Sequence, residues 1–214
     1  MSTNENGTGT GTGTDATMSR ADASAWWFFI VIGAAFAVWT VVRAVIRIAE
    51  IVPNSDVRVF AQFRETLAEA PIGPDGAPVA VELQTAYLRA PELPVASVGA
   101  LVIEQVVIAV SVVTTIACLL FVVRSVLRGR MFSRTNTRLV NTAGATALAG
   151  FVLAPFFANM GANGAFAWIS DRTFDNVLMS VDLTQLFAVA FAAALLIATF
   201  AVGERLQRDT EGLV

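Results

Sequence analysis

Four apolar stretches, each long enough to cross a lipid bilayer, constrain this chain more than any other feature. They cover residues 25–42, 106–123, 139–158 and 186–203, and none of them contains a charged side chain. A helix of about 18–20 residues rises roughly 27–30 Å, which matches the thickness of the hydrocarbon layer. We therefore expect an all-α membrane protein with four transmembrane helices.

The composition agrees with a chain immersed in lipid and argues against several kinds of site. Hydrophobic residues make up 56% of the chain and charged residues 14%, against about 25% charged residues in an average soluble domain. There is no histidine, and the single cysteine, Cys118, lies within the second apolar stretch. An internal disulfide and a thiolate–imidazole metal cluster are therefore excluded. We expect no cofactor, no metal ion and no enzymatic activity, because the chain carries no recognisable catalytic motif. A net charge of −3 gives no reason to expect direct nucleic-acid binding.

The short connection between the second and third apolar stretches predicts the orientation in the membrane. It contains five arginines and no acidic residue, and short arginine-rich connections remain in the cytoplasm. Arg205 and Arg208, after the last apolar stretch, agree with this orientation. We expect both termini in the cytoplasm of a multi-pass plasma-membrane protein. The five arginines of the connection are Arg124, Arg128, Arg130, Arg134 and Arg138.

The apolar stretches also predict the boundaries of the segments. Before the first of them, residues 7–14 repeat Gly-Thr, a low-complexity composition with almost nothing to bury, so this region is expected to be disordered. In chain order we expect a disordered cytoplasmic tail at 1–24, a helix at 25–48, an extracytoplasmic segment at 49–97, a helix at 98–126, a cytoplasmic arginine-rich turn at 127–136, a helix at 137–160, an extracytoplasmic loop at 161–182, a helix at 183–205 and a cytoplasmic tail at 206–214.

The extracytoplasmic segment at 49–97 is too long for a bare linker. Its part at 79–88 alternates as a strand does, with Val79, Val81, Leu83, Thr85 and Tyr87 on one face. The part at 57–64 alternates more weakly, and either a partner strand or a short helix fits it. Proline and glycine between these parts indicate a turn. We expect a small β-like cap on the outer helix ends.

Small residues predict how the helices associate. In lipid the hydrophobic effect does little to bring helices together, so close approach through Ala and Gly matters. The third and fourth stretches both carry such residues at a spacing of four, which favours a tight pair between them. An alanine-rich proteome explains the same residues without any pairing.

Glu104 is the most informative single residue, because a carboxylate inside a membrane helix is costly unless it is paired or hydrated. Arg43 and Arg47 lie at the same expected depth in the first helix, and Asp182 and Gln185 begin the fourth helix at that depth. These residues form a candidate intramembrane polar network. Glu104 would be either a proton- or ion-sensitive switch or one half of a structural ion pair.

The arginine-rich turn has the features of an ordinary helical hairpin. Gly129 can end the second helix, and Ser133 or Asn136 can cap the third. Phe132 is expected at the membrane surface, among arginines that meet anionic lipid. The same residues are candidates for contact with a partner protein. The candidate contact residues are Gly129, Arg130, Phe132, Ser133, Asn136 and Arg138.

These turn residues resemble the G-x-P-F-S-x-x-N-x-R turn of a family of uncharacterised bacterial four-helix membrane proteins, known as a domain of unknown function. The segments 203–206 and 209–214 similarly resemble the family's closing G-x-x-L and D-x-E-G-L-V patterns. Met131 stands where the family usually has proline. The resemblance implies a plasma-membrane protein of unestablished activity, often encoded beside a small helix-turn-helix regulator, and it defines no catalytic residue. The C-terminal motif comprises Asp209, Glu211, Gly212, Leu213 and Val214.

Two classes of function remain open from the sequence. The first is a regulatory or sensory membrane protein, or an accessory subunit, which engages a cytoplasmic regulator or a membrane partner through the turn and the C-terminal tail. The second is a small transporter or channel, formed as a homo-oligomer, that uses Glu104 along its path.

Overall fold

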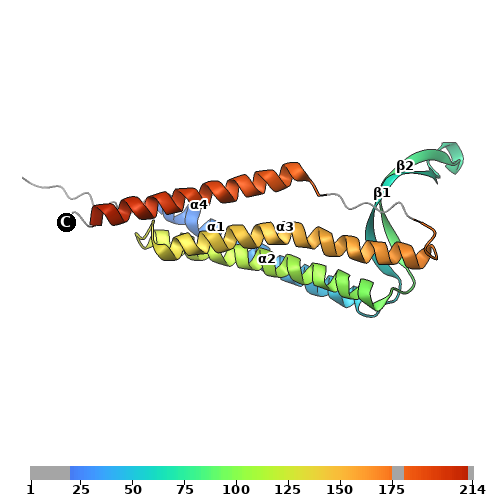
Figure 1. Cartoon of the computed structure of the whole chain (residues 1–214), viewed down its shortest axis with the longest axis horizontal. Helices are drawn as coiled ribbons and strands as arrows, with labels where there is room; N and C mark the ends of the chain where they lie inside the picture. The colour runs from blue at the N-terminus through green and yellow to red at the C-terminus, as the bar shows by residue number, and fades with distance from the viewer. Residues whose placement is uncertain (1–19, 175–180, 212–214) are drawn as a thin grey trace, which may run out of the picture.

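The computed structural model describes residues 20–174 and 181–211, and four long helices dominate it (Figure 1). All four are long and apolar enough to cross a membrane, as the sequence predicts. A two-stranded hairpin lies at one end of the helices, here called the hairpin end, and both ends of the described chain lie at the other, here called the termini end. The helices are α1 (Arg20–Ile51), α2 (Val95–Leu127), α3 (Arg134–Ile169) and α4 (Leu183–Glu211).

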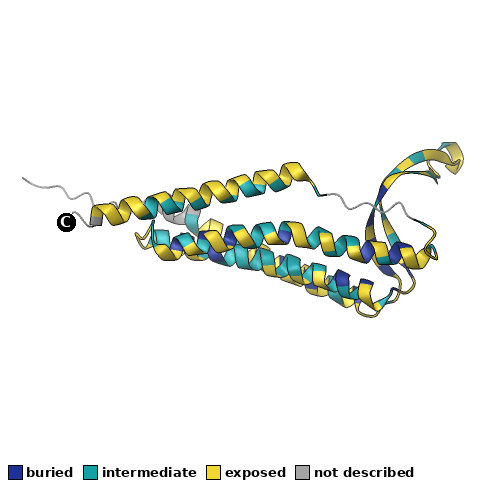
Figure 2. Cartoon of the chain, in the orientation of Figure 1, coloured by how far each residue is buried: buried dark blue, intermediate teal, exposed yellow. Residues whose placement is uncertain are grey.

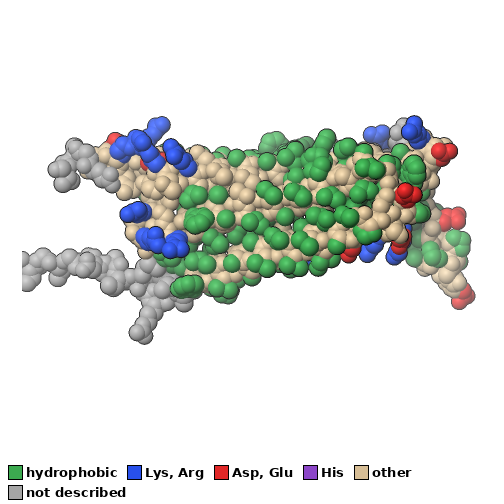
Figure 3. Space-filling view, turned by 90° about the horizontal axis from the view of Figure 1, so that it is seen from below, with side chains coloured by type: hydrophobic (Ala, Val, Ile, Leu, Met, Phe, Trp, Pro, Cys, Tyr) green, Lys and Arg blue, Asp and Glu red, His purple; other side chains and the backbone are tan. Residues whose placement is uncertain are grey.

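On the face shown in Figure 3, hydrophobic side chains cover the middle of the molecule, and charged side chains gather towards its two ends. Large apolar side chains of α1 and α4 are exposed, and residues 183–210 include no buried side chain (Figure 2). Exposed apolar patches of this extent indicate a surface covered by lipid or by another chain. The length and the composition of the helices thus fit a multi-pass membrane protein.

Each helix contacts its neighbours in sequence, α1 with α2, α2 with α3 and α3 with α4, and the most extensive of these contacts joins α2 to α3. Close approach there depends on glycines of α3. A Cβ at Gly150 would overlap Ser111, and a Cβ at Gly161 would overlap Leu101. The tight pair expected between the third and fourth spans, α3 and α4, therefore makes a less extensive contact than the pair of α2 and α3. Gly144 of α3 does face Ala193 of α4, but Gly150, Gly161 and Gly164 of α3 face α2.

The extracytoplasmic segment predicted at 49–97 contains an antiparallel hairpin of β1 (Val57–Ala70) and β2 (Val79–Ala90). A single 3-10 turn, η1 (Pro74–Gly76), connects the strands. The predicted β-like cap is thus confirmed as a two-stranded sheet, and residues 57–64 form a strand instead of the alternative helix.

A bulge changes which face of the hairpin is buried. The register shifts between Gln62 and Thr66, where Glu65 adopts a φ of 41°. Four residue steps of β1, from Gln62 to Thr66, lie opposite two of β2, from Thr85 to Leu83, and the buried face changes across this irregularity in both strands. In β2 the better-buried residues are therefore Val81 and Leu83 near the tip but Ala86, Leu88 and Ala90 near the base. The sequence pattern placed Thr85 and Tyr87 on the better-buried face, and this is wrong because the bulge reverses the alternation between them and the tip.

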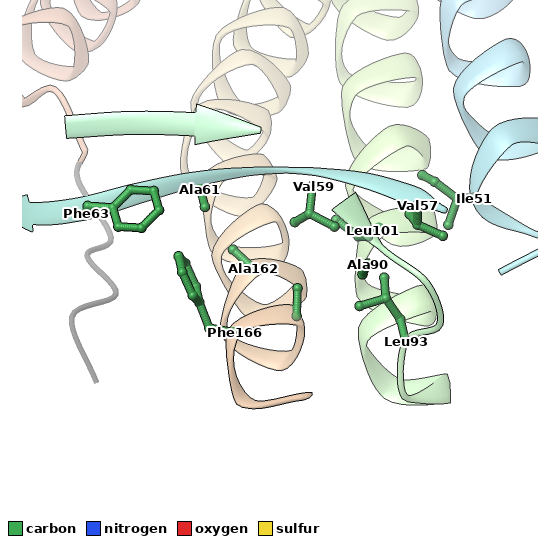
Figure 4. Packing of buried hydrophobic residues seen from close by; sticks show 11 residues of the cluster. Ile51, Val57, Val59, Ala61, Phe63, Ala90, Leu93, Leu101, Ala162 and Phe166 are labelled. Atoms are coloured by element: carbon green, nitrogen blue, oxygen red, sulfur yellow. The ribbon is translucent and has the colours of Figure 1, made fainter. Parts of the chain in front are cut away.

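The principal buried core lies at the hairpin end, where β1 runs across the ends of α3 and α2 (Figure 4). Ala61 and Phe63 lie beside Ala162 and Phe166, and the two phenylalanine rings meet edge to face at 5.1 Å between centroids. This packing fixes the base of the hairpin on the helices. The cluster comprises Ile51, Val57, Val59, Ala61, Phe63, Ala90, Leu93, Leu101, Ala162, Ala165 and Phe166.

All four helices extend beyond their predicted boundaries. α3 continues to Ile169, through much of the range expected as a loop, because Gly161 and Gly164 let it pack closely against α2. α4 continues to Glu211, into the expected tail, where Arg208 pairs with Glu204 one turn earlier. Residues 20–24, expected in the N-terminal tail, begin α1. The rest of that tail (1–19) and parts of the expected outer loop (175–180) and C-terminal tail (212–214) lie outside the described residues.

Candidate functional site

A polar pocket of about 430 Å³ lies at the hairpin end, between the hairpin and the helices. Residues from α1, β1, β2, α2 and α3 line it, so it depends on the whole arrangement of this end. We call it the hairpin-end pocket. Its lining residues are Arg43, Arg47, Glu50, Arg58, Phe60, Tyr87, Leu101, Glu104, Gln105 and Ala158.

The pocket contains three of the five residues of the polar network predicted from sequence. Glu104, Arg43 and Arg47 all line it. Asp182 and Gln185 do not line the pocket. The Asp182 carboxylate instead accepts a hydrogen bond of 3.1 Å from the backbone N–H of Gln185 and so caps α4. The structure does not bring these two residues to the pocket, because residues at one depth are neighbours only if their helices touch, and α4 contacts α3 instead of α1 or α2.

Arg47 connects the end of α1 to the hairpin. Its guanidinium donates to the carboxylate of Glu50 at 2.9 Å and also to the backbone carbonyl of Arg58. One side chain thus links α1 with β1 and lines the pocket together with Glu104. This link holds the wall of the pocket that the hairpin contributes.

The hairpin adds a cation and two aromatic rings that the sequence did not reveal. The guanidinium of Arg58 lies 4.8 Å from the centroid of the Tyr87 ring, and Tyr87 meets Phe60 edge to face at 5.5 Å. These residues face the pocket because the opposite face of the hairpin base packs on the helices. The alternation of 57–64 was the only signal for Arg58 and Phe60, and the bulge concealed the position of Tyr87.

A second group of candidate residues lies at the termini end, in the turn between α2 and α3. Gly129 has a φ of 76°, as expected for the residue that ends α2. The Ser133 hydroxyl accepts a 3.2 Å hydrogen bond from the backbone N–H of Asn136, so Ser133 caps α3. The Asn136 side chain is fully buried and donates to the carbonyls of Arg130 and Met131 at 2.7 and 2.9 Å. Of the two proposed caps, Ser133 is the cap, and Asn136 closes the turn.

The last turns of α4 pack against this turn. Phe132 lies so close to Gly203 that a Cβ there would overlap its ring, and it meets Phe200 edge to face at 5.7 Å. The Glu204 carboxylate accepts a hydrogen bond from Thr137 at 2.8 Å. The two segments that carry the family resemblance, around 129–138 and 203–206, are therefore in contact.

Glu204 also joins two arginines of this end. Its carboxylate lies 2.6 Å from the guanidinium of Arg208 and 3.5 Å from that of Arg134. A depression of about 360 Å³ lies beside these groups. We call this region the turn site, and its lining residues are Arg130, Phe132, Ser133, Arg134, Glu204, Gln207 and Arg208.

The remaining candidates at this end take no part in the depression. Arg138 is exposed on α3 and Asp209 on α4. Glu211 ends α4, while Gly212, Leu213 and Val214 lie outside the described residues. The C-terminal motif thus stays a prediction.

A third cavity of about 440 Å³ lies at mid-depth, lined by residues of all four helices and mostly apolar. Its hydroxyl groups donate to backbone carbonyls, Ser111 to Ile108 at 3.1 Å and Thr115 to Ala143 at 3.4 Å. In the part of the chain that the structure describes, no three potential metal ligands come together.

Comparisons with protein-family models, with curated proteins and with solved structures give no match. The resemblance to the four-helix family therefore depends on the short motifs quoted above.

Proposed function

We propose that this chain is a regulatory or accessory membrane protein of the plasma membrane, with its termini end in the cytoplasm. The turn site is the surface that contacts a partner. The observation that carries this proposal is the contact between two segments far apart in sequence, which meet around Phe132 and Glu204 beside several exposed arginines.

The contacts within the turn site favour its interpretation as a surface for a partner, because a plain connector between two helices would not need them. A connector between two membrane helices needs little beyond a glycine and a cap. Here a buried asparagine also closes the turn, and Glu204 ties Arg208 and the beginning of α3 together. These contacts hold Arg130, Arg134 and Arg208 around one depression. Three guanidiniums against one carboxylate favour an acidic segment of a partner.

The arginine content also supports the cytoplasmic placement of this end. Short connections rich in arginine are retained in the cytoplasm, and the partner then has to be a cytoplasmic regulator or a membrane neighbour with a cytoplasmic face. A regulator encoded nearby, as the resemblance implies, fits the first of these descriptions.

Transport by a homo-oligomer through Glu104 is less well supported. The mid-depth cavity next along α2 from Glu104 is mostly apolar, and the hydroxyls of Ser111 and Thr115 are engaged by the backbone. A path for an ion or a polar solute needs polar groups that face it. Such groups would have to come from another copy of the chain.

Partner capture in living cells tests the proposal. A photo-crosslinking residue replaces Thr135, which is exposed beside the turn site, and the products are identified by mass spectrometry. A matched strain carries the same residue at Leu67, which is 80% exposed on the hairpin. A DNA-binding or signalling protein captured at Thr135 alone supports a regulatory role, and a membrane protein supports an accessory role.

Loss of that product in an Arg130→Gln/Arg208→Gln chain would assign the contact to the turn site. Capture of lipid or of the chain itself would contradict both roles. Flux measurements that compare the native chain with Glu104→Gln would then decide whether it transports a solute.

A further inference from the structure

The hairpin-end pocket lies at the boundary of the apolar layer. About twenty residues of helix, or about 30 Å, separate Arg124 from Glu104 on α2 and Arg138 from Ala158 on α3. On α1 the charge-free stretch 23–42 ends at Arg43. Three helices thus place residues of the pocket at one level, where the hydrocarbon layer gives way to the phosphate groups of the lipids.

Positive charge exceeds negative charge in the pocket. Three arginines and two glutamates line it, which leaves one net positive charge. Arg47 pairs with Glu50 at 2.9 Å.

The other two guanidiniums have no carboxylate partner within the described residues. Arg43 lies 5.9 Å from the centroid of the Trp39 ring, and Arg58 lies 4.8 Å from that of Tyr87. Stacking on a ring orients a guanidinium while leaving its N–H groups available. Both arginines line the pocket, so both are available to an anion inside it.

The walls of the pocket suit a ligand that is charged on one side and apolar on the other. Phe60 and Tyr87 form an aromatic wall, and Leu101 and Ala158 add apolar surface from α2 and α3. The volume of about 430 Å³ lies within the range of about 300–1,000 Å³ that is usual for small-molecule sites. Arginine forks match the oxygens of a phosphate group, and one net positive charge matches a singly charged phosphodiester.

We propose that the hairpin-end pocket binds a phosphate group between Arg43 and Arg58, supplied either by a phospholipid headgroup or by a free phosphate ester. This site is separate from the turn site and does not depend on the partner proposed for it. The hairpin covers the bound group, and Arg47 pairs with Glu50 at its side.

The test uses the full chain, purified in a neutral detergent, and measures dissociation constants for three probes. These are short-chain phosphatidylglycerol, a diacylglycerol with the same acyl chains, and inorganic phosphate. We expect phosphatidylglycerol to bind at least about tenfold more tightly than diacylglycerol, because only the former carries the phosphate group. Binding of phosphatidylglycerol but not of inorganic phosphate identifies a lipid headgroup, and comparable binding of both identifies a free phosphate ester.

Variants of opposite expected effect separate ligand binding from loss of structure. Arg43→Gln and Arg58→Gln should each weaken phosphate binding about tenfold, and Arg58→Lys, which keeps the charge but loses the fork, should weaken it less. Glu104→Gln removes a negative charge from the pocket and should strengthen binding severalfold. Arg64→Gln is the matched control, because Arg64 is exposed on the same strand as Arg58 but does not line the pocket.

Equal affinity of the native chain and both arginine variants would overturn the proposal, as would equal binding of diacylglycerol. A loss of affinity in Glu104→Gln, parallel to that in the arginine variants, would overturn it too. Thermal unfolding of each variant identifies any that fails to fold, and Arg58→Lys then supplies the comparison.

Discussion

The side-chain amide of Asn54 makes two hydrogen bonds with the backbone of Leu93 and so closes the base of the hairpin. Its Nδ2 donates to the Leu93 carbonyl at 3.0 Å, and its Oδ1 accepts from the Leu93 N–H at 2.9 Å. Asn54 has a φ of 52°, a backbone conformation that asparagine tolerates better than most residues. The connection after α1 and the connection before α2 are thus joined directly.

Replacing Asn54 should loosen the hairpin in a graded series. Asn54→Gly keeps the backbone conformation but loses both hydrogen bonds, at an expected cost of about 1–3 kcal/mol in the free energy of unfolding. Asn54→Ala adds strain of about 1 kcal/mol at the positive φ. Asn54→Asp keeps the acceptor alone and should fall between the native chain and Asn54→Gly. Thermal unfolding in detergent measures the series, and a Gly variant as stable as the native chain would show that the joint contributes nothing.

Gly150 should tolerate no larger side chain, because a Cβ there would overlap the side chain of Ser111 on α2. We expect Gly150→Ala to destabilise the α2–α3 pair by about 1–3 kcal/mol. The matched control is Gly99→Ala, where a Cβ would meet nothing within 4 Å and alanine is the better helix former.

A double-mutant cycle assigns the effect to this contact. Ser111→Gly removes the atoms that the added methyl group would meet, so Gly150→Ala should cost less in that background than in the native chain. An equal cost in both backgrounds would refute the proposed clash. Resistance to unfolding in denaturing detergent measures all four chains.

Replacing Asn136 with aspartate should destabilise the turn between α2 and α3. Asn136→Asp has almost the same shape but cannot donate to the carbonyls of Arg130 and Met131, and it would place a carboxylate beside them. We expect it to destabilise the turn by about 1–3 kcal/mol, at least as much as Asn136→Ala does. Hydrogen exchange of the turn amides, together with thermal unfolding, measures the loss. Native protection in Asn136→Asp would mean that the volume of the side chain matters and its donors do not.

Labelling with a membrane-impermeant thiol reagent tests the orientation. Cys118 is the sole cysteine and is buried, so Cys118→Ala gives a background for single cysteines. With the termini in the cytoplasm, Leu67→Cys on the hairpin is labelled in intact cells and Thr135→Cys beside the turn only after permeabilisation. The reverse pattern would place the turn site outside the cell and remove the basis for a cytoplasmic partner.

The helices and the hairpin could be predicted because each depends on a local pattern. Apolar runs without charge define the spans, and alternation around a Pro/Gly-rich turn defines the strands. The meeting of Glu104 with Arg43 and Arg47 followed from depth alone, since depth in a membrane helix can be counted along the sequence. At the other end, Gly129 and Ser133 were recognisable from turn and capping preferences.

The other features of the sites and of the helix pairing depend on which surfaces meet in the fold, and no local sequence pattern carries that information. Asp182 has the same expected depth as Glu104 but belongs to a helix that does not reach the pocket. Tyr87 faces the pocket because the buried face of the strand changes at the irregularity near Glu65, and the alternation on either side of it stays intact. The small residues of α3 were visible, but Ser111 and Leu101, which show that α2 is their main partner, look like any other helix residues.

The sequential contacts of the helices have a consequence for how the two sites arise during synthesis. Every residue that lines the hairpin-end pocket lies between Arg43 and Ala158, so that pocket is complete before the ribosome reaches α4. The turn site is complete only after Glu204 and Arg208, in the last turns of α4, have been synthesised. A chain that stops before α4 would therefore keep one site and lack the other. Insertion of the last helix is the step at which the protein gains its second surface.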